Sequence, residues 1–351
     1  MSNLALPSAK DQLDFIKWIQ RLFSDGDFTA TYKYALIIAL TDLAVELGED
    51  SVAPLTLSMT SIAEKFAELY WNQTTPFPNP FSEEHILSQN IGKQAFVINQ
   101  LVKLRSQGLS NLANARGSEY WGKTIKAIAN NVYKMPVLHL QNIAGGVEEV
   151  LYKTPSNSLQ ITLNPNVGYC LRKYQTLIQR LARGGWLEHV RNNKNNLGIL
   201  GPGADLESFM FQTDRNNLIP ARELLRDLQE GRCFYCGKKM HDSADVDHFI
   251  PWSRYPRDLG HNFVLAHGAC NRSKRDWLAS QKHLEHWLER NTLHDYLIQN
   301  SMRDIGFIAD SDSSKAIAKW AYAQAVDNNL LVWVSGKSFE PINSFVMNVF
   351  D

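Results

Sequence analysis

Four potential metal ligands occur as two pairs in the second half of the chain. Cys233 and Cys236 form a C-x-x-C pair, and His267 and Cys270 form an H-x-x-C pair about thirty residues later. Thiolate and imidazole are the usual ligands of structural zinc, and two such pairs can meet at one tetrahedral ion. The spacing therefore predicts a Zn²⁺ site of three sulfurs and one nitrogen, with His241 as a competitor for the position of His267.

Polar residues with a different chemistry lie between and after these pairs. Asp247 and His248 are adjacent, Asn262 follows them, and Asn271 comes directly after the last cysteine. From about residue 231 to 277, this order resembles the HNH endonucleases, the ββα-metal nucleases that include one nuclease domain of the RNA-guided CRISPR enzymes. The resemblance implies a nuclease domain with two metals, one structural and one catalytic.

The resemblance also assigns roles to these residues. The zinc is structural, because two short fingers have too little core to hold themselves. Cleavage of a phosphodiester needs a base for water and a hard cation on the phosphate oxygens. His248 is the implied base, since an imidazole titrates near neutral pH. Asp247 and Asn271 are the implied oxygen ligands of Mg²⁺ or Mn²⁺, and Asn262 is implied to fix the loop that carries the histidine.

A zinc knuckle alone is common in proteins that only bind nucleic acid. Such a knuckle would explain the four zinc ligands, but it would not explain the order Asp-Val-Asp-His and Cys-Asn-x-x-Lys. The interpretation is therefore a metal-dependent endonuclease that hydrolyses DNA phosphodiester bonds. The alternative is a zinc-stabilised DNA-binding protein with a non-cleaving module. The settings in which HNH domains occur favour a bacterial antiviral defence or restriction nuclease.

The formal net charge of zero hides an uneven distribution of charge. Residues 1–100 carry 12 acidic and 6 basic side chains, whereas residues 101–200 carry 13 basic and 4 acidic ones. A polyanion such as DNA would meet the middle third first. A helix expected at 167–183 places four basic residues opposite its apolar stripe: Arg172, Lys173, Arg180 and Arg183. We interpret them as phosphate contacts, and a solvated outer face is the alternative.

Three more basic residues follow the last zinc ligand, where a backbone phosphate would lie in an HNH module: Arg272, Lys274 and Arg275. The remaining cysteine, Cys170, lies in an apolar-rich segment and is expected to be a buried free thiol. No pair is left for a disulfide, and the first residues do not resemble a signal peptide, so a cytoplasmic location is expected. The longest apolar stretch, residues 34–47, contains Asp42 and Glu46 and is not expected to span a membrane.

Apolar periodicity predicts a mainly helical α+β fold around the HNH domain. Helices are expected at 12–23, from about 29 or 31 to 47, at 61–70, from 82, at 167–183 with Gly184-Gly185 as its end, from 220, at 281–291 and at 313–326. Strands are expected at 136–138, 159–163, 186–190 and 330–334.

These elements suggest four segments. They are a helical N-terminal domain at 1–130, a small α/β segment with the basic helix at 131–205, the HNH nuclease domain at 216–280, and C-terminal helices with a strand at 281–351. The acidic N-terminal domain is expected to contact a protein partner or a second copy of the chain. One HNH module cuts one strand, so a double-strand break needs a dimer or two visits.

Overall fold

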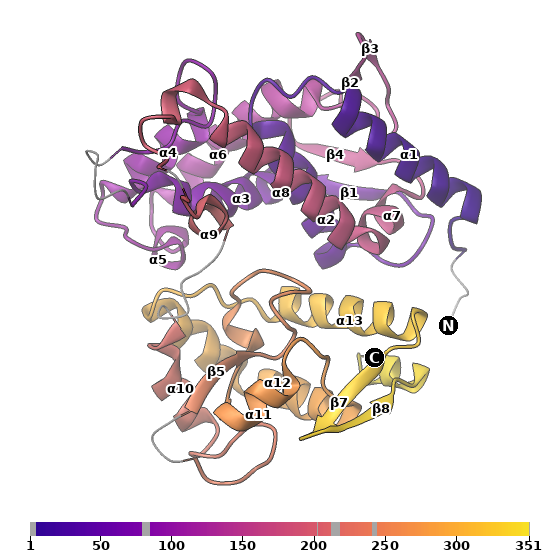
Figure 1. Ribbon diagram of the computed structural model, residues 1–351, viewed down its shortest axis with the longest axis vertical. Helices are drawn as coiled ribbons and strands as arrows, with labels where there is room; N and C mark the ends of the chain where they lie inside the picture. Colours follow the sequence, from indigo (N-terminus) through magenta and orange to yellow (C-terminus); the bar gives the residue numbers. More distant parts are fainter. Residues whose placement is uncertain (1–4, 79–84, 202, 212–217, 241–243, 351) are drawn as a thin grey trace. The chain divides into compact units, whose positions relative to one another are not determined.

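The computed structural model describes residues 5–78, 85–201, 203–211, 218–240 and 244–350. The chain falls into two compact units, Met1–Ser110 with Ala115–Gln212 and Asn111–Asn114 with Thr213–Asp351. Both are mainly helical with small sheets, which confirms the expected α+β class (Figure 1). Segments 1–130 and 131–205 fall in the first unit, apart from Asn111–Asn114, and segments 216–280 and 281–351 fall in the second.

The first part of the chain consists of helices joined by short strands. The helices up to residue 211 are α1 (Ala9–Asp25), α2 (Tyr32–Leu47), α3 (Met59–Trp71), α4 (Phe96–Arg105), α5 (Leu112–Arg116), α6 (Trp121–Val132), α7 (Val167–Lys173), α8 (Gln175–Arg191) and α9 (Leu206–Phe211). Strand β1 (Leu55–Ser58) pairs antiparallel with β4 (Gln160–Leu163), and β2 (Asn142–Ile143) pairs with β3 (Gly146–Val147).

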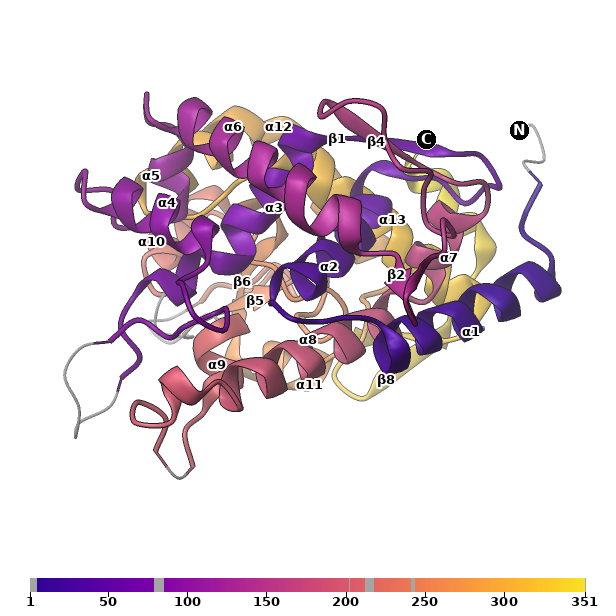
Figure 2. The same ribbon diagram turned by 90° about the horizontal axis from the view of Figure 1, so that it is seen from above.

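Helix α2 forms the centre of the first unit. Its side chains are apolar nearly all round, and Leu36, Ile38 and Leu40 are fully buried, as expected of a helix enclosed by others. Helices α3, α7 and α8 pack against it, and α8 runs alongside it in Figure 2. The helix ends where the amide of Gly48 donates to the carbonyl oxygen of Ala44 at 3.0 Å.

The strand expected at 136–138 is wrong, because this segment is a π-helical turn, Tyr133–Val137, that continues α6. Pro136 and Val137 are buried in it, and the amide of Leu140 donates to the carbonyl oxygen of Pro136 at 2.7 Å. Three apolar residues in a row do not distinguish a strand from a buried turn. By contrast, the strand expected at 159–163 is confirmed as β4.

The helix expected at 167–183 is two helices, and the strand expected at 186–190 is wrong. The helical path breaks at Tyr174, and α8 then continues through Gly184 and Gly185 to Arg191. The reason is the burial of Trp186, whose Nε1 donates to Oε1 of the buried Gln89 at 2.8 Å. Burial of a large aromatic side chain stabilises by more than the roughly 1 kcal/mol that each glycine costs in a helix.

The second unit contains the segment with the candidate metal ligands. Its helices are α10 (Ala221–Leu228), α11 (Gly268–Lys274), α12 (Gln281–Asp304) and α13 (Ser311–Asp327). Its strands are β5 (Ala244–His248), β6 (Phe263–His267), β7 (Leu331–Ser335) and β8 (Ser338–Pro341). The antiparallel pair β5–β6 followed by α11 is the ββα arrangement that the sequence predicted. The competing ligand His241 lies outside the described residues. The helix expected from residue 82 is wrong over its described part, because residues 85–95 are not helical and the next helix, α4, begins at Phe96.

Helix α12 supports the β5–β6 pair through hydrogen bonds to the backbone at the start of β6. The buried guanidinium of Arg290 donates to the carbonyl oxygens of His261 and Phe263, each at 2.7 Å. The indole of Trp287 also donates to the carbonyl oxygen of His261, at 2.9 Å. These hydrogen bonds, of which the two from Arg290 are charge-assisted, hold the start of β6 in place. None of the described helices is both long enough and apolar enough to cross a lipid bilayer.

Candidate metal centre and active site

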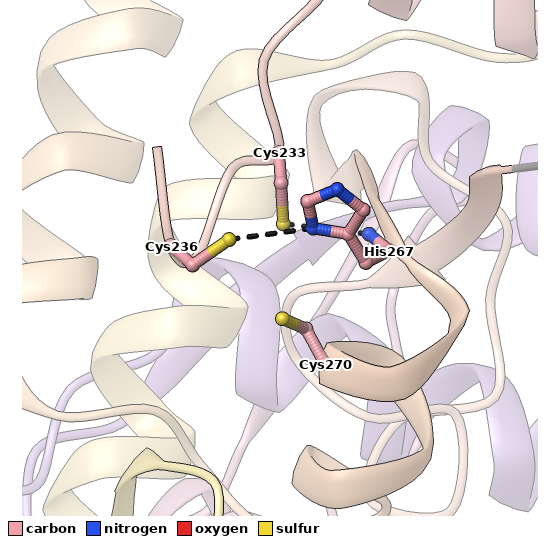
Figure 3. Close-up of side chains that lie close together, drawn as sticks. All are labelled: Cys233, Cys236, His267 and Cys270. Atoms are coloured by element: carbon pink, nitrogen blue, oxygen red, sulfur yellow. Dashed lines mark hydrogen bonds between the residues drawn. The ribbon is translucent and has the colours of Figure 1, made fainter. Parts of the chain in front are cut away.

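The turn that carries the first cysteine pair is closed by its own backbone. The amide of Cys233 donates to the carbonyl oxygen of Lys238, and the amide of Gly237 donates to that of Cys233, both at 2.9 Å. Gly237 has a φ of +69°, a conformation that glycine adopts without steric cost. In Figure 3, the sulfur atoms of Cys233 and Cys236 point toward His267.

His267 and Cys270 complete the cluster from the end of β6 and the first turn of α11. The ligand atoms of the four residues lie within 4.8 Å of one another (Figure 3). Nδ1 of His267 is 3.3 Å from Sγ of Cys236, whereas a protonated Nε2 donates to the carbonyl oxygen of Lys239 at 3.2 Å. Zinc-ligating histidines usually have such a partner on the outer nitrogen, because it fixes the tautomer. This cluster therefore fits Zn²⁺.

The electrostatics of the cluster also favour a bound cation. Burial, followed by the negative charge of Cys233 and Cys236, raises the pKa of the Cys270 thiol to about 12. Three sulfurs this close together repel one another as thiolates unless a cation lies between them. Zinc removes that repulsion and deprotonates the thiols that bind it.

Pairing with β6 fixes the position of each polar residue of β5 and the face of the strand on which its side chain lies. Asp247 lies opposite Val264 and His248 lies opposite Phe263 in the antiparallel register. Val264 and Phe263 are adjacent on β6 and face opposite sides of the strand, and both are fully buried, so β6 lies within the core. Because side chains alternate along a strand, Asp245 and Asp247 share one face of β5 and His248 lies on the other.

The carboxylate of Asp247 is held through one of its two oxygens. Oδ2 accepts a hydrogen bond from the Tyr235 hydroxyl at 2.6 Å and an ion-pair contact from Lys274 Nζ at 3.1 Å. Lys274 is fully buried and also donates to the carbonyl oxygen of His248 at 2.9 Å. Burial lowers the pKa of Lys274, and the negative charge of Asp247 opposes that shift. Within the described residues, Asp247 Oδ1 makes no hydrogen bond and is not sealed from solvent.

The amide of Asn271 is oriented by Asp245, which lies on β5. Nδ2 of Asn271 donates to Oδ2 of Asp245 at 3.3 Å, which leaves Oδ1 of the amide available. Asp245 also lies close to Gly268, where an added Cβ would come within 3.2 Å of the same carboxylate oxygen. The free oxygens of Asp247 and Asn271 are hard donors, and their chemistry fits Mg²⁺ or Mn²⁺.

His248 has a carboxylate partner, Asp258, ten residues further along the chain. Nε2 of His248 lies 2.7 Å from Oδ1 of Asp258, and their side chains are only 15% and 12% exposed. The rings of Trp252 and Phe263 meet the imidazole edge-on, with centroids 5.4 and 5.1 Å away. These contacts restrict the rotation of the ring.

Asn262, directly before the start of β6, is hydrogen-bonded to the loop that follows His248. Its Oδ1 accepts from the amide of Ile250 at 2.7 Å, and its Nδ2 donates to the carbonyl oxygen of Ile250 at 3.0 Å. The carbonyl oxygen of Asn262 also accepts from the amide of Phe249 at 2.8 Å. The side chain is buried and engaged on both of its polar atoms, so it acts on the loop and not on a solvent-exposed reactant.

Sequence reasoning missed two groups that surround the candidate centre and gave a third group a different role. Tyr235 lies inside the zinc turn and carries no separate signal for an Asp247 contact. Asp258 lies in a loop where an aspartate is usual. Lys274 was expected to face phosphate, but it is buried and paired with Asp247. The inward position of Lys274 could have been inferred only from its place on the short helix α11, because residues four apart lie on the same face of a helix.

The proposed DNA contacts on the basic helix are not on one exposed face. Arg172 is buried, donates to the carbonyl oxygens of Ala44 and Val45, and pairs with Asp50 at 2.9 Å. The break at Tyr174 removes the continuous helix on which the shared face depended. Lys173 lies over the ring of Tyr169, and Arg183 lies over the ring of Phe211. Of the basic residues proposed for DNA contact, Arg180, Arg272 and Arg275 are exposed.

Comparison with known proteins agrees with the geometry of this centre. Residues 233–276 match the family model described as HNH endonuclease. The match begins at the first zinc ligand and includes β5, β6 and α11, so the second unit contains an HNH domain. No curated protein and no solved structure matches this chain.

Proposed function

We propose that this protein is a metal-dependent endonuclease that hydrolyses phosphodiester bonds of DNA. One observation carries the proposal. The zinc-type cluster and the HNH match cover the same ββα unit, and this unit carries Asp247, His248 and Asn271. A binding module needs the cluster but has no use for an oriented imidazole together with hard oxygen donors in the same ββα unit. The combination therefore favours cleavage over binding alone.

In the proposed reaction, His248 accepts a proton from the attacking water. Oδ1 of Asp247 and Oδ1 of Asn271 would hold Mg²⁺ or Mn²⁺, while Lys274 and Asp245 keep these side chains oriented. When bound, the cation would supply charge stabilisation at the phosphate and leaving oxygens. The cluster of Cys233, Cys236, His267 and Cys270 would hold structural Zn²⁺.

The test is nicking of supercoiled plasmid by the purified protein in Mg²⁺, in Mn²⁺ and in a chelator. We expect cleavage with a divalent cation and a rate reduction of roughly 10²–10⁴-fold in His248→Ala, with DNA binding retained. His139→Ala removes an exposed histidine of the first unit and is the control, with an unchanged rate. A wild-type protein that binds DNA but leaves it intact with both cations would instead support the non-cleaving alternative.

The biological setting that we propose is bacterial defence or restriction, in the cytoplasm. Its support is the domain type alone. Bacteria that express the chain should resist phage in a plaque assay, and His248→Ala should abolish the resistance. A double-strand break would further require two modules, so we propose a second copy or a protein partner that contacts the first unit. Sedimentation with and without DNA tests for the second copy.

A further inference from the structure

The pairing of His248 with Asp258 determines which imidazole nitrogen can act as a base. A carboxylate accepts hydrogen bonds, so Nε2 must carry the proton in the 2.7 Å contact with Oδ1 of Asp258. In the neutral ring, the lone pair then lies on Nδ1. Nδ1 has no hydrogen-bond partner within the described part of the chain, and it is not sealed from solvent.

The backbone around Asp258 is fixed on both sides. The amide of Arg257 donates to the carbonyl oxygen of Tyr255 at 2.9 Å. Leu259 is buried and forms a parallel bridge with Ile308, and the amide of Gly260 donates to the carbonyl oxygen of Ile308 at 2.8 Å. The loop therefore brings the carboxylate to His248 from a rigid backbone, as a positioning group requires.

The second oxygen of Asp258 adds no hydrogen bond to the described part of the fold. Oδ2 is buried and has no hydrogen-bond partner among the described residues. A buried acceptor without a partner costs about 1–3 kcal/mol. Asparagine or serine could bond a histidine at lower cost, but a carboxylate accepts only, and it therefore selects one tautomer.

We infer that Asp258 is a positioning residue that holds His248 as the Nε2–H tautomer, so that Nδ1 takes the proton from the attacking water. The inference rests on the proposed nuclease function and adds a residue to it. Asp258 acts through the imidazole and touches neither the water nor the phosphate. The HNH match does not assign this role.

The tautomer can be measured without activity, from long-range ¹⁵N–¹H correlations of the His248 ring at a pH where it is neutral. We expect the Nε2–H form in the wild type and a mixture or the Nδ1–H form in Asp258→Asn, since the amide of asparagine can donate to Nε2. Asp295→Ala is the matched control, because it removes another His–Asp contact of this unit, that of His261 at 2.9 Å. An Nδ1–H ring in the wild type would overturn the inference.

Cleavage kinetics supply the second measurement. Asp258→Asn and Asp258→Ala should reduce kcat by roughly 10- to 100-fold, as loss of an outer partner of a reactive histidine typically does, with little change in KM. In a His248→Ala background, the same substitutions should have almost no further effect, because their action passes through the ring. Asp295→Ala should keep the wild-type kcat.

The two proposals fail in different ways. A wild-type protein without cleavage in Mg²⁺ or Mn²⁺ refutes the nuclease function. If the wild type cleaves DNA and folded Asp258→Asn has the same kcat, the positioning role is refuted and the nuclease function stands. Equal losses from Asp258→Ala in the wild-type and His248→Ala backgrounds would also refute it, since the carboxylate would then act independently of the imidazole.

Discussion

At the residue scale, each polar side chain of the candidate centre is held through one atom and keeps another atom available for chemistry. Asp247 is held through Oδ2 and Asn271 through Nδ2, and each keeps one oxygen available. His248 follows the same rule, since Nε2 is engaged and Nδ1 is not. Groups held in this way lose little conformational freedom when a cation or substrate arrives, which is the benefit of preorganisation.

The zinc ligands and the remaining cysteine should respond differently to the same substitution. Cys270→Ser removes a ligand, so bound zinc should fall from about one per chain to nearly none. The melting temperature should fall with it, by roughly 2–4 °C for each kcal/mol lost. Cys170→Ser is the matched control: burial raises the pKa of that thiol to about 12 and keeps it away from metal. Elemental analysis that finds equal zinc in both variants would contradict the assignment.

At the scale of elements, α8 shows how a tertiary contact overrides a local signal. Gly184-Gly185 normally ends a helix, but here the helix continues because Trp186 must reach its buried position. Only the second glycine is required by packing. An added Cβ at Gly185 would lie 2.5 Å from Cε1 of Tyr34, whereas one at Gly184 would have no neighbour within 4 Å.

The two glycines should therefore respond in opposite directions to the same change. Gly184→Ala should stabilise the protein by about 0.5–1 kcal/mol, because alanine lowers the entropy cost of the helix. Gly185→Ala should destabilise it by about 1–3 kcal/mol, since the Tyr34 ring stacks on Phe28 at 4.4 Å and cannot move without loss. Thermal denaturation of both variants tests this. Stabilisation of equal size in both would show that Tyr34 does not occupy this space.

At the scale of the whole molecule, the proposed function requires a chain of zero net charge to gather positive charge where it would meet DNA. Arg172, the first residue of the expected basic face, is buried and paired with Asp50. In the second unit, Arg272 and Arg275 on and next to α11 are exposed, close in sequence to the proposed cation ligand Asn271. We therefore expect Arg272 and Arg275 to make phosphate contacts and Arg172 to support the fold.

Replacing Arg272 and Arg275 together with glutamine should weaken binding to all duplexes alike. Each lost phosphate contact lowers the slope of log affinity against log salt by about 0.9, so the slope should flatten by nearly 2 units. Lys315→Gln with Lys319→Gln is the control, because it removes two exposed charges from α13 of the same unit. An unchanged slope in the arginine variant, measured by fluorescence anisotropy, would exclude these phosphate contacts.

The chemistry of the centre could be read from the sequence because it depends on residue types at short spacing. Two pairs with the spacing C-x-x-C and H-x-x-C, and the ββα order between them, are local properties that survive any arrangement of the surrounding helices. The zinc-type cluster and the β5–β6–α11 unit were therefore predicted correctly. The assignments of His248, Asp247, Asn262 and Asn271 to catalysis remain predictions.

Tertiary structure alone decided which polar groups meet and which basic residues stay exposed. Arg172 joins Asp50 across 122 positions, and Trp186 joins Gln89 across 97, distances over which periodicity carries no information. Asp258 is close to His248 in sequence, but its contact depends on the path of the whole loop. For Trp186, burial and hydrogen bonding of a large side chain contribute more free energy than the local preference of Gly184-Gly185 that they override. The sequence alone therefore determined the chemical groups of the centre, and packing determined their partners.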